Sequence, residues 1–313
     1  MSLNQEAQDH PAALRVLVTG AQGQLGRALQ ACIARLPTGS IVAQTLDRRT
    51  LDITCDDSVA ACLDRFPADV LINAAAYTAV DRAAQEPQQA MAVNAKAPER
   101  LARACAQRDI RLLHVSTDYV FDGQSSRPYI ETDHVHPLNT YGASKLEGER
   151  AVLAHAPDSL ILRTSWVFSA HGYNFVKTIL RLARERSTLQ VIDDQIGGPT
   201  WAGHIAEVLL ALSMRARACT PAGLYHFSGN PTISWYGFAQ EIIDQALHLG
   251  LIQRRPEVRA IAGRDWPAAE PRPDNSGLDN SKLAALMEPL PRDWRSGLQT
   301  TLQTLAQTPE ALQ

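Results

Sequence analysis

Tyr141 and Lys145 carry side chains that could together supply a proton to a substrate. They lie four residues apart in the run Tyr-Gly-Ala-Ser-Lys, and on a helix this spacing places both on one face, one turn apart. A nearby ammonium group favours the phenolate, so we expect Lys145 to lower the pKa of the Tyr141 phenol and to ease proton transfer at neutral pH. Such pairs also arise by chance on surface helices. Whether this pair is catalytic therefore depends on the elements that surround it.

Short apolar runs alternate with helical patterns through the first half of the chain, as in a parallel sheet covered on both faces. The predicted strands are 14–19, 41–46, 70–73, 112–116 and 160–162, and the predicted helices are 25–36, 57–66, 86–108 and one that contains Tyr141. We therefore expect an α/β fold with a Rossmann-type, doubly wound parallel sheet, in a dinucleotide-binding domain of residues 12–165.

Beyond about Ser165 the alternation weakens, and proline and glycine cluster in three places. The segments expected there are helices at 174–185, 204–212, 236–249 and 293–305 and a short strand at 224–227. They predict a smaller α/β lobe over residues 166–313, mainly for binding a nucleotide sugar, with some later segments returning to the first domain.

A glycine-rich turn stands between the first predicted strand and the first helix. Its sequence is Gly20-Ala-Gln-Gly23-Gln24-Leu25-Gly26, where a tight turn lets backbone amides approach a pyrophosphate. The spacing differs from the usual Gly-x-Gly-x-x-Gly, and the flanking strand and helix give it weight. We expect these residues to bind a dinucleotide.

The end of the second predicted strand bears on the choice between NADH and NADPH. Asp47 follows the last glycine by about 20 residues, where a carboxylate accepts hydrogen bonds from the adenosine ribose of NADH. Arg48 and Arg49 come next, and guanidinium groups suit the 2′-phosphate of NADPH, so both cofactors remain open. The other residues expected at the cofactor are Asp52 and Ile53 near the adenine and Ala74, Ala75 and Ala76 after the third strand.

Ser116-Thr117-Asp118-Tyr119-Val120-Phe121 closes the fourth predicted strand, at the edge where parallel sheets bind ligands. With the glycine turn, Asn73 to Ala76 and the Tyr141/Lys145 pair, this order of motifs resembles the extended short-chain dehydrogenase/reductase family. The runs 74–81, 116–123, 137–142 and 163–168 further resemble the dTDP-4-dehydrorhamnose reductases. The resemblance covers nearly the whole chain.

The resemblance implies reduction of the C4 ketone of dTDP-4-dehydro-6-deoxy-L-mannose to dTDP-L-rhamnose with NADPH or NADH, a step in making a cell-wall sugar donor. It implies that Tyr141 donates the proton, that Lys145 holds the nicotinamide ribose, and that Thr117 bonds the ketone oxygen. The residues it assigns to the substrate are Thr117, Asp118, Trp166, Asn174 and Arg272. Trp166 could instead be a core tryptophan between the lobes, since tryptophan is highly buried on average. Asn94 resembles an asparagine that braces the cofactor-side helix, and a local hydrogen bond within its helix is an alternative.

One departure concerns metal and assembly. Some members of the family are described as dimers joined through Mg²⁺ held by glutamates, one of which lies on the first helix. That stretch here is Gly26-Arg-Ala-Leu-Gln30, which has no acid. We therefore expect no metal site, and either a monomer or a homodimer.

Three other activities compete with the reductase. A 4,6-dehydratase needs an Asp-Glu pair after the threonine, and this chain has Asp118-Tyr119. A nucleotide-sugar 4-epimerase uses the same tyrosine, and the runs at 77–81 and 163–166 favour the reductase over it. A non-catalytic dinucleotide-binding regulatory subunit, like one known relative of these enzymes, remains open, although Thr117, Tyr141 and Lys145 favour an enzyme.

Composition excludes several other classes. The 313 residues carry a formal net charge of -3 and 45% hydrophobic residues, which suits a globular protein and gives no basic field for nucleic acid or an anionic membrane. The N-terminal residues lack a signal peptide pattern, and no apolar stretch is long enough to span a bilayer. The five cysteines have no Cys-x-x-Cys pair. We expect a cytoplasmic enzyme with reduced thiols and no membrane contact.

Overall fold

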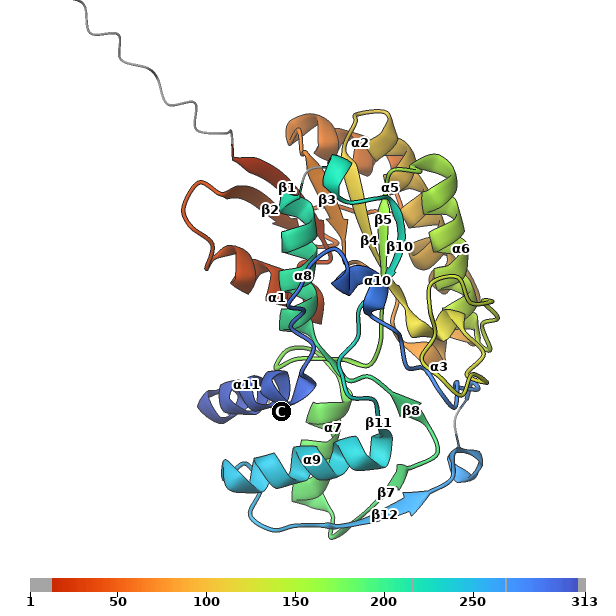
Figure 1. Cartoon of the computed structure of the whole chain (residues 1–313), viewed down its shortest axis with the longest axis vertical. Coiled ribbons are helices and arrows are strands. Elements are labelled where there is room, and N and C mark those ends of the chain that lie inside the picture. The colour runs from red at the N-terminus through yellow and green to blue at the C-terminus, as the bar shows by residue number, and fades with distance from the viewer. Residues whose placement is uncertain (1–12, 216, 268, 309–313) are drawn as a thin grey trace, which may run out of the picture.

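The computed structural model describes residues 13–215, 217–267 and 269–308, which form an upper lobe built on a sheet and a lower lobe that is mainly helical (Figure 1). The main sheet has six strands in the order β10-β5-β4-β3-β1-β2, and every pairing in it is parallel. Its strands are β1 (Leu14–Thr19), β2 (Ile41–Leu46), β3 (Val70–Asn73), β4 (Arg111–Thr117), β5 (Leu160–Thr164) and β10 (Gly223–His226).

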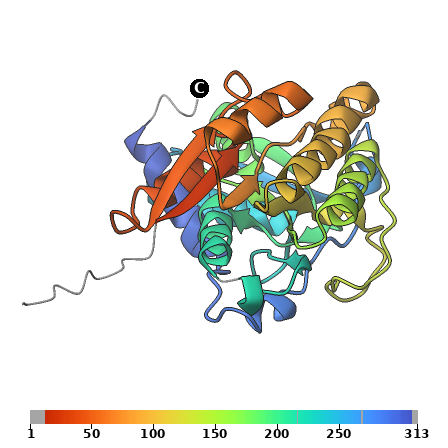
Figure 2. The same ribbon diagram turned by 90° about the horizontal axis from the view of Figure 1, so that it is seen from above.

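Side chains that alternate along the strands build an apolar core on each face of this sheet. Val16 and Val18 pack in one core while Leu17, between them, packs in the other, as the two-residue period of a strand requires. The helices of the upper lobe are α1 (Gln24–Ile33), α2 (Asp56–Arg65), α3 (Val80–Ala83), α4 (Pro87–Met91), α5 (Ala97–Ala106), α6 (Thr140–His155), α8 (Ala202–Met214) and α10 (Ser281–Ala284). Helix α1 packs against α8, and α5 lies beside α6 (Figure 2).

The lower lobe has its own apolar core, formed by α7 (Phe175–Glu185), α9 (Trp235–His248), α11 (Trp294–Gln307) and the strand β7 (Thr188–Ile192). Strand β7 pairs in parallel with β12 (Glu257–Ile261). Two further two-stranded pairs join β6 (Val167–Phe168) to β9 (Thr200–Trp201) and β8 (Ile196–Gly197) to β11 (Ile233–Ser234). The chain returns to the main sheet after residue 165, because β10 pairs with β5.

The predicted strands of the sheet agree with the structure within two residues at each end. The helix expected over 86–108 is instead α4, a π-helical turn at Ala92–Lys96 and α5. Strands β7 and β12 were not predicted. The predicted α/β fold with a doubly wound parallel sheet is confirmed.

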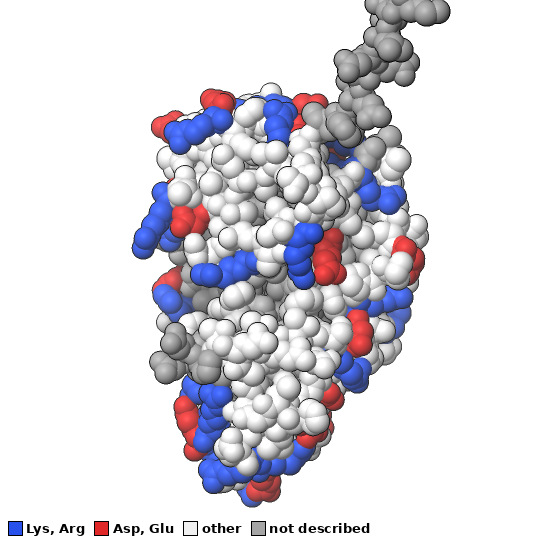
Figure 3. Space-filling model, turned by 90° about the vertical axis from the view of Figure 1, so that its left-hand side faces the viewer, with Lys and Arg blue, Asp and Glu red and all other residues white. Residues whose placement is uncertain are grey.

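Charged side chains of both signs are interspersed on the face of the molecule drawn in Figure 3. No patch of a single sign dominates that face. This distribution agrees with the nearly balanced composition, and it gives that face no field to attract a polyanion.

Candidate active site

The glycine turn lies at the point where the strand order of the sheet reverses. Strand β1 has β2 on one side and β3 on the other, and ligands of open parallel sheets bind outside the carboxyl ends of strands at such a point. The glycine turn follows β1, and Ala74 to Ala76 follow β3. The structure thus places two of the predicted cofactor segments side by side.

Close backbone packing explains two of the three glycines in the turn. Gly20 has φ +75, and a Cβ there would lie 2.8 Å from Ala75 N and 2.9 Å from Ala74 O. A Cβ on Gly26 would lie 2.2 Å from Gly20 O. Neither position has room for a side chain, and the backbone of the turn leads into α1 in the way a pyrophosphate site requires. These residues fit a dinucleotide.

The structure gives structural roles to the side chains of three residues expected at the cofactor, Gln24, Leu25 and Ile53. Leu25 and Ile53 are 9% and 8% exposed and belong to the cores on opposite faces of the sheet, so Leu25 can meet a cofactor only through its backbone. The side chain of Gln24 bonds to the lower lobe, as described below.

Asp47 and Asp52 both close turns after β2. Asp47 Oδ1 accepts hydrogen bonds from the amides of Arg49 and Thr50, each at 3.0 Å, and bonding by Thr50 lowers the pKa of Asp47. Asp52 Oδ1 accepts from Thr54 Oγ1 at 2.6 Å, which lowers its pKa likewise. Both are therefore carboxylates at neutral pH. Arg48 is exposed next to Asp47, so an acidic and a basic side chain both lie at the end of β2.

Thr117, Asp118 and Tyr141 meet at the carboxyl end of β4. The Thr117 hydroxyl lies 2.9 Å from Asp118 Oδ1, and it is near enough to the Tyr141 phenol to lower the pKa of Tyr141. The ring of Tyr119 packs edge-on against Tyr141 with centroids 5.7 Å apart. A Cβ on Gly142 would lie 2.1 Å from Tyr119 O, so this glycine lets α6 approach β4 closely enough to bring the three groups together.

The expectation that Lys145 lowers the pKa of Tyr141 is wrong for this structure. Burial and, to a smaller extent, the charge of Asp118 raise the pKa of Tyr141 to about 12, and the Thr117 hydroxyl opposes that rise. Lys145 Nζ donates instead to Val115 O at 2.7 Å. Tyr141 therefore keeps its proton at neutral pH, which is the form a proton donor needs.

Lys145 lies near a buried ion pair that the sequence did not indicate. Burial lowers the pKa of Lys145 to about 8, and the charge of Glu149, one turn further along α6, opposes that fall. Glu149 in turn accepts two hydrogen bonds from Arg163, from Nε at 2.8 Å and from Nη2 at 2.6 Å. The Arg163 and Glu149 side chains are 2% and 3% exposed. A charge this deep needs its partner, so Arg163 fixes Glu149 beside Lys145.

Asn94 connects the loop after β3 to α6. It lies in the π-helical turn, accepts from Tyr77 N at 2.8 Å, and donates to Ser144 Oγ at 3.0 Å. These partners are 17 and 50 residues away, so the local hydrogen bond considered from the sequence is wrong. Asn94 braces Ser144, which is the neighbour of Lys145 on α6.

Trp166 lies where the chain passes from β5 of the main sheet to β6. Its indole stacks on Trp235 with centroids 3.4 Å apart and an angle of 5° between the planes, and a Cβ on Gly197 would lie 2.4 Å from it. The backbone of Trp166 has φ +44, which is strained for a bulky residue. Trp166 is partly exposed and packs against the lower core, and its contact with the sugar stays a prediction.

Asn174 and Arg272 each join segments that are distant in sequence. Asn174 Oδ1 caps α7 by accepting from Lys177 N at 3.1 Å, and its Nδ2 donates to Gln24 Oε1 at 2.9 Å. Arg272 Nη2 lies 2.9 Å from Asp81 Oδ2, and its Nε is buried without a hydrogen-bond partner among the described residues. The side chain of Asn174 thus has structural partners already, while Arg272 keeps a free donor.

Comparison with known proteins agrees with this geometry. The family model described as RmlD substrate binding domain matches residues 14–307. A dTDP-4-dehydrorhamnose reductase of Aggregatibacter actinomycetemcomitans is 46% identical over 286 residues, which are 91% of this chain and 97% of that protein. The chain belongs to the dTDP-4-dehydrorhamnose reductase family.

Two solved structures from this family show the same fold. The dTDP-4-dehydrorhamnose reductase of Clostridium acetobutylicum superposes with a TM-score of 0.85 at 34% identity, covering 93% of this chain and 99% of that one. The dTDP-4-dehydrorhamnose reductase of Bacillus anthracis, solved in complex with NADP, gives a TM-score of 0.85 at 32% identity with the same coverage. The resemblance stated from the sequence motifs is confirmed.

No group of three or more His, Cys, Asp or Glu side chains that could hold a metal ion occurs among the described residues. Over the same part of the chain, no helix is long and apolar enough to cross a bilayer. The five cysteines are free thiols, and burial raises the pKa of Cys105 to about 12.

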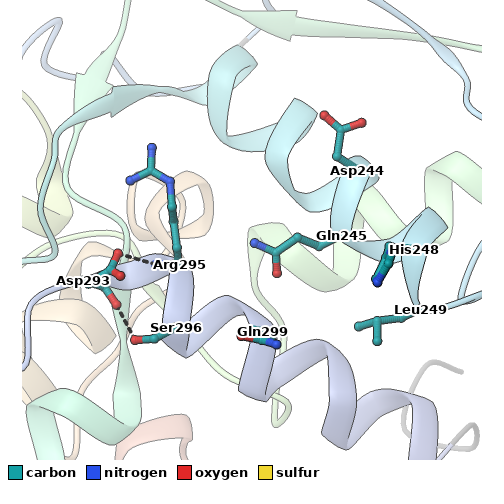
Figure 4. Close-up of a pocket in the computed structure, with 8 residues that line it drawn as sticks. All are labelled: Asp244, Gln245, His248, Leu249, Asp293, Arg295, Ser296 and Gln299. Carbon is teal, nitrogen blue, oxygen red and sulfur yellow. Dashed lines mark hydrogen bonds between the residues drawn. The ribbon is translucent and has the colours of Figure 1, made fainter.

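A surface hollow of about 460 Å³ lies elsewhere, between α9 and α11 of the lower lobe (Figure 4). Its lining residues are Asp244, Gln245, His248, Leu249, Asp293, Arg295, Ser296 and Gln299. It shares no residue with the site around Tyr141, and Asp293 and Ser296 bond one another as part of the cap of α11. We therefore assign the chemistry to the carboxyl edge of the main sheet.

Proposed function

We propose that this chain reduces the C4 ketone of dTDP-4-dehydro-6-deoxy-L-mannose to dTDP-L-rhamnose with NADPH or NADH. The meeting of Thr117 and Tyr141 at the carboxyl end of β4, beside the glycine turn, carries the proposal. A bound nicotinamide would supply the hydride. The protein must then neutralise charge on the ketone oxygen as it develops.

Tyr141 is the proton donor in this proposal. Its raised pKa keeps it protonated at neutral pH, so it can deliver its proton to the C4 oxygen as that oxygen becomes basic. Thr117 donates a hydrogen bond to the same oxygen. Lys145, charged below a pKa of about 8, holds the nicotinamide ribose in this proposal.

The cofactor is held by the backbone of Gly20, Gly23 and Gly26 and by the segments after β2 and β3. The acid at Asp47 and the base at Arg48 suit NADH and NADPH respectively, and we propose that both are accepted. Asp52, Ala74, Ala75 and Ala76 complete the proposed cofactor contacts.

The lower lobe selects the nucleotide sugar. Trp166 is partly exposed directly after β5, and the free Nε of Arg272 is suited to a phosphate or sugar oxygen. We propose that these two side chains and Asn174 contact the nucleotide sugar. We propose that the reaction takes place in the cytoplasm, because it uses a nicotinamide cofactor and a nucleotide sugar, and that the chain acts as a monomer or a homodimer.

A coupled assay tests the function. The dTDP-glucose 4,6-dehydratase and the epimerase that follows it would generate the substrate in place, and the loss of NADPH or NADH would be followed by absorbance. We expect cofactor loss matched mole for mole by dTDP-L-rhamnose. Cofactor that binds without formation of product would favour the non-catalytic regulatory subunit. Formation of the C4 epimer of dTDP-glucose without net loss of reduced cofactor would indicate an epimerase.

A further inference from the structure

Three buried polar side chains form a row across the carboxyl ends of β1, β3 and β4. Thr19, Asn73 and His114 are register partners on these neighbouring strands, and each is at most 1% exposed. Thr19 Oγ1 donates to Asn73 Oδ1 at 2.7 Å, and Asn73 Nδ2 lies 2.9 Å from His114 Nδ1. Buried polar groups are costly unless they are bonded, so the three side chains depend on one another.

A backbone amide fixes the direction of the bonds in this row. Ala75 N lies 3.3 Å from Asn73 Oδ1 and 3.4 Å from Thr19 Oγ1, and an amide N–H can only donate. The Asn73 atom beside Ala75 is therefore the oxygen, and the amino group of Asn73 points to His114. Nδ1 of His114 accepts that hydrogen, which leaves the ring hydrogen on Nε2.

The surroundings of His114 keep its ring neutral, as this bond requires. Burial and, to a smaller extent, the charge of Lys145 lower the pKa of His114 well below its usual value. Its Nε2 is buried without a hydrogen-bond partner among the described residues, so Asn73 is the group that sets the tautomer. A protonated ring would turn an N–H toward the amino group of Asn73 and break the row.

The row ends at the two segments proposed to hold the dinucleotide. Thr19 immediately precedes Gly20, and Asn73 immediately precedes Ala74. The backbones of the two segments are in close contact, since a Cβ on Gly20 would lie 2.8 Å from Ala75 N. The spacing between the segments therefore depends on the groups that hold the Ala75 amide.

We propose that His114 is a positioning residue for the cofactor: by accepting from Asn73, it orients the side-chain amide that holds the Ala75 backbone against the glycine turn. His114 acts from the neighbouring strand, through Asn73. The cofactor site is then already formed in the free enzyme, so binding does not have to order it. The inference rests on the proposed binding of a nicotinamide dinucleotide at the glycine turn.

Two substitutions at His114 separate its hydrogen bond from its volume. In His114→Asn the amide oxygen can take the place of Nδ1, whereas His114→Leu fills the space without an acceptor. His114→Leu should raise the Kd for NADPH about 5- to 10-fold, as expected for one unmade buried hydrogen bond, and His114→Asn should stay within about twofold of the wild type. Isothermal titration calorimetry measures both. Equal affinities for the two variants, or a greater loss with asparagine, would overturn the proposal.

A role at the cofactor also predicts which kinetic constant changes. With saturating NADPH, His114→Leu should keep kcat within about twofold of the wild type, and the loss should be confined to the KM for NADPH. A fall in kcat at saturation with an unchanged Kd would contradict the proposal and indicate a role beside Lys145.

Ser213→Ala is the control for lost stability. It removes a buried hydrogen bond of 2.7 Å to Leu209 O within α8, so it should lower the free energy of unfolding and leave the Kd for NADPH unchanged. A rise in Kd equal to that of His114→Leu would show that lost stability alone explains the effect, and the proposal would fail.

Thr19→Val tests whether the effect passes through Asn73. Valine has the shape of threonine without the hydroxyl that donates to Asn73. Because each single substitution loosens the same amide, the double variant should raise the Kd by clearly less than the product of the two single effects. Effects that multiply independently would contradict the route through Asn73.

NMR spectroscopy tests the tautomer without any cofactor. In protein labelled at its histidine nitrogens, the ring of His114, identified by its loss in His114→Asn, should carry a hydrogen on Nε2 and none on Nδ1. A hydrogen on Nδ1 would overturn the inference. Failure of the wild-type protein to bind NADPH or NADH would instead reject the proposed function, and the NMR spectrum would still decide the direction of the row.

Discussion

The two walls of the proposed site are built in different ways. On the sheet side, Lys145, Glu149 and Arg163 form a buried chain of charges, and Asn94 ties α6 to the loop after β3. On the lower-lobe side, Trp166 is placed by ring stacking on Trp235 and by contact with a glycine. One wall is fixed by directional polar bonds and the other by apolar surface.

This difference matches what each wall must do. Proton donation needs atoms placed to within fractions of an ångström, and buried hydrogen bonds and ion pairs impose that geometry because leaving them unmade is costly. Recognition of a sugar and a base needs mainly flat apolar surface with a few polar contacts. Changes to the sheet side should therefore act on kcat, and changes to the lower lobe on KM.

The largest effect is expected from Tyr141→Phe, which removes the proton donor and leaves the ring. We expect kcat to fall by about 10²- to 10⁴-fold with little change in cofactor affinity, since general acid catalysis typically contributes that much. Steady-state kinetics and cofactor titration by fluorescence would measure both. Turnover near the wild-type rate would reject the role of Tyr141 and the proposed division between the walls.

The next largest effect is expected from Glu149→Gln, which removes the acidic partner of the buried Arg163. The change leaves Arg163 buried beside a neutral amide, which should cost about 3–5 kcal/mol in the free energy of unfolding. Because Glu149 raises the pKa of Lys145, its loss should also move the alkaline decline of kcat/KM, governed by a Lys145 pKa of about 8 in the wild type, to lower pH.

Glu147→Gln is the matched control on the same helix. Glu147 pairs with Arg150 on the surface, where their side chains are 48% and 61% exposed, so its loss should change stability by less than about 1 kcal/mol. Chemical denaturation would compare the two variants. Equal stability losses, or an alkaline limb that stays in place in Glu149→Gln, would refute the buried chain as a support for Lys145.

A smaller effect is expected from Trp235→Ala on the opposite wall. This change removes the ring on which Trp166 stacks, and such aromatic pairs contribute about 0.5–1.5 kcal/mol. The KM for the nucleotide sugar should rise by roughly 2- to 12-fold, which is that energy as a ratio of binding constants, while kcat changes little. A fall in kcat without a rise in KM would contradict the division between the walls.

The smallest effect is expected at the link between the lobes. Asn174→Ser keeps a hydroxyl that can cap α7 but loses the bond to Gln24, whereas Asn174→Ala loses both. We expect Asn174→Ala to cost about 1 kcal/mol of stability and Asn174→Ser only a few tenths. If both variants equally raise the KM for the nucleotide sugar without loss of stability, Asn174 is a direct substrate contact and not only a link.

The sheet and its motifs could be predicted because the information is local. Val16, Leu17 and Val18 form a continuous apolar run that ends at a glycine, and a buried parallel strand requires such a run. The place of Thr117 and Tyr141 followed from the rule that ligands bind at the carboxyl ends of strands. The strands β7 and β12 could not be foreseen, because their paired residues, such as Thr188 and Glu257, are far apart in the sequence and no single turn joins the two short segments.

The electrostatics could not be predicted because they depend on burial. From the sequence, Lys145 next to Tyr141 indicated a lowered phenol pKa, and the structure shows that desolvation and the Asp118 charge outweigh such an effect. In the sequence, Glu149 is one of several acidic residues on a predicted helix. Only the structure shows that Arg163, on β5, donates hydrogen bonds to it. A carboxylate four residues after Lys145 on the same face was the signal available.

Transfer of a labelled hydride tests the central claim most directly. The enzyme would turn over dTDP-4-dehydro-6-deoxy-L-mannose with a reduced cofactor carrying deuterium at the transferred position, and the isolated sugar would be analysed by mass spectrometry and NMR. We predict one deuterium, at C4 of dTDP-L-rhamnose, for each cofactor oxidised. A product without deuterium, or labelled cofactor that stays bound and reduced, would contradict the account.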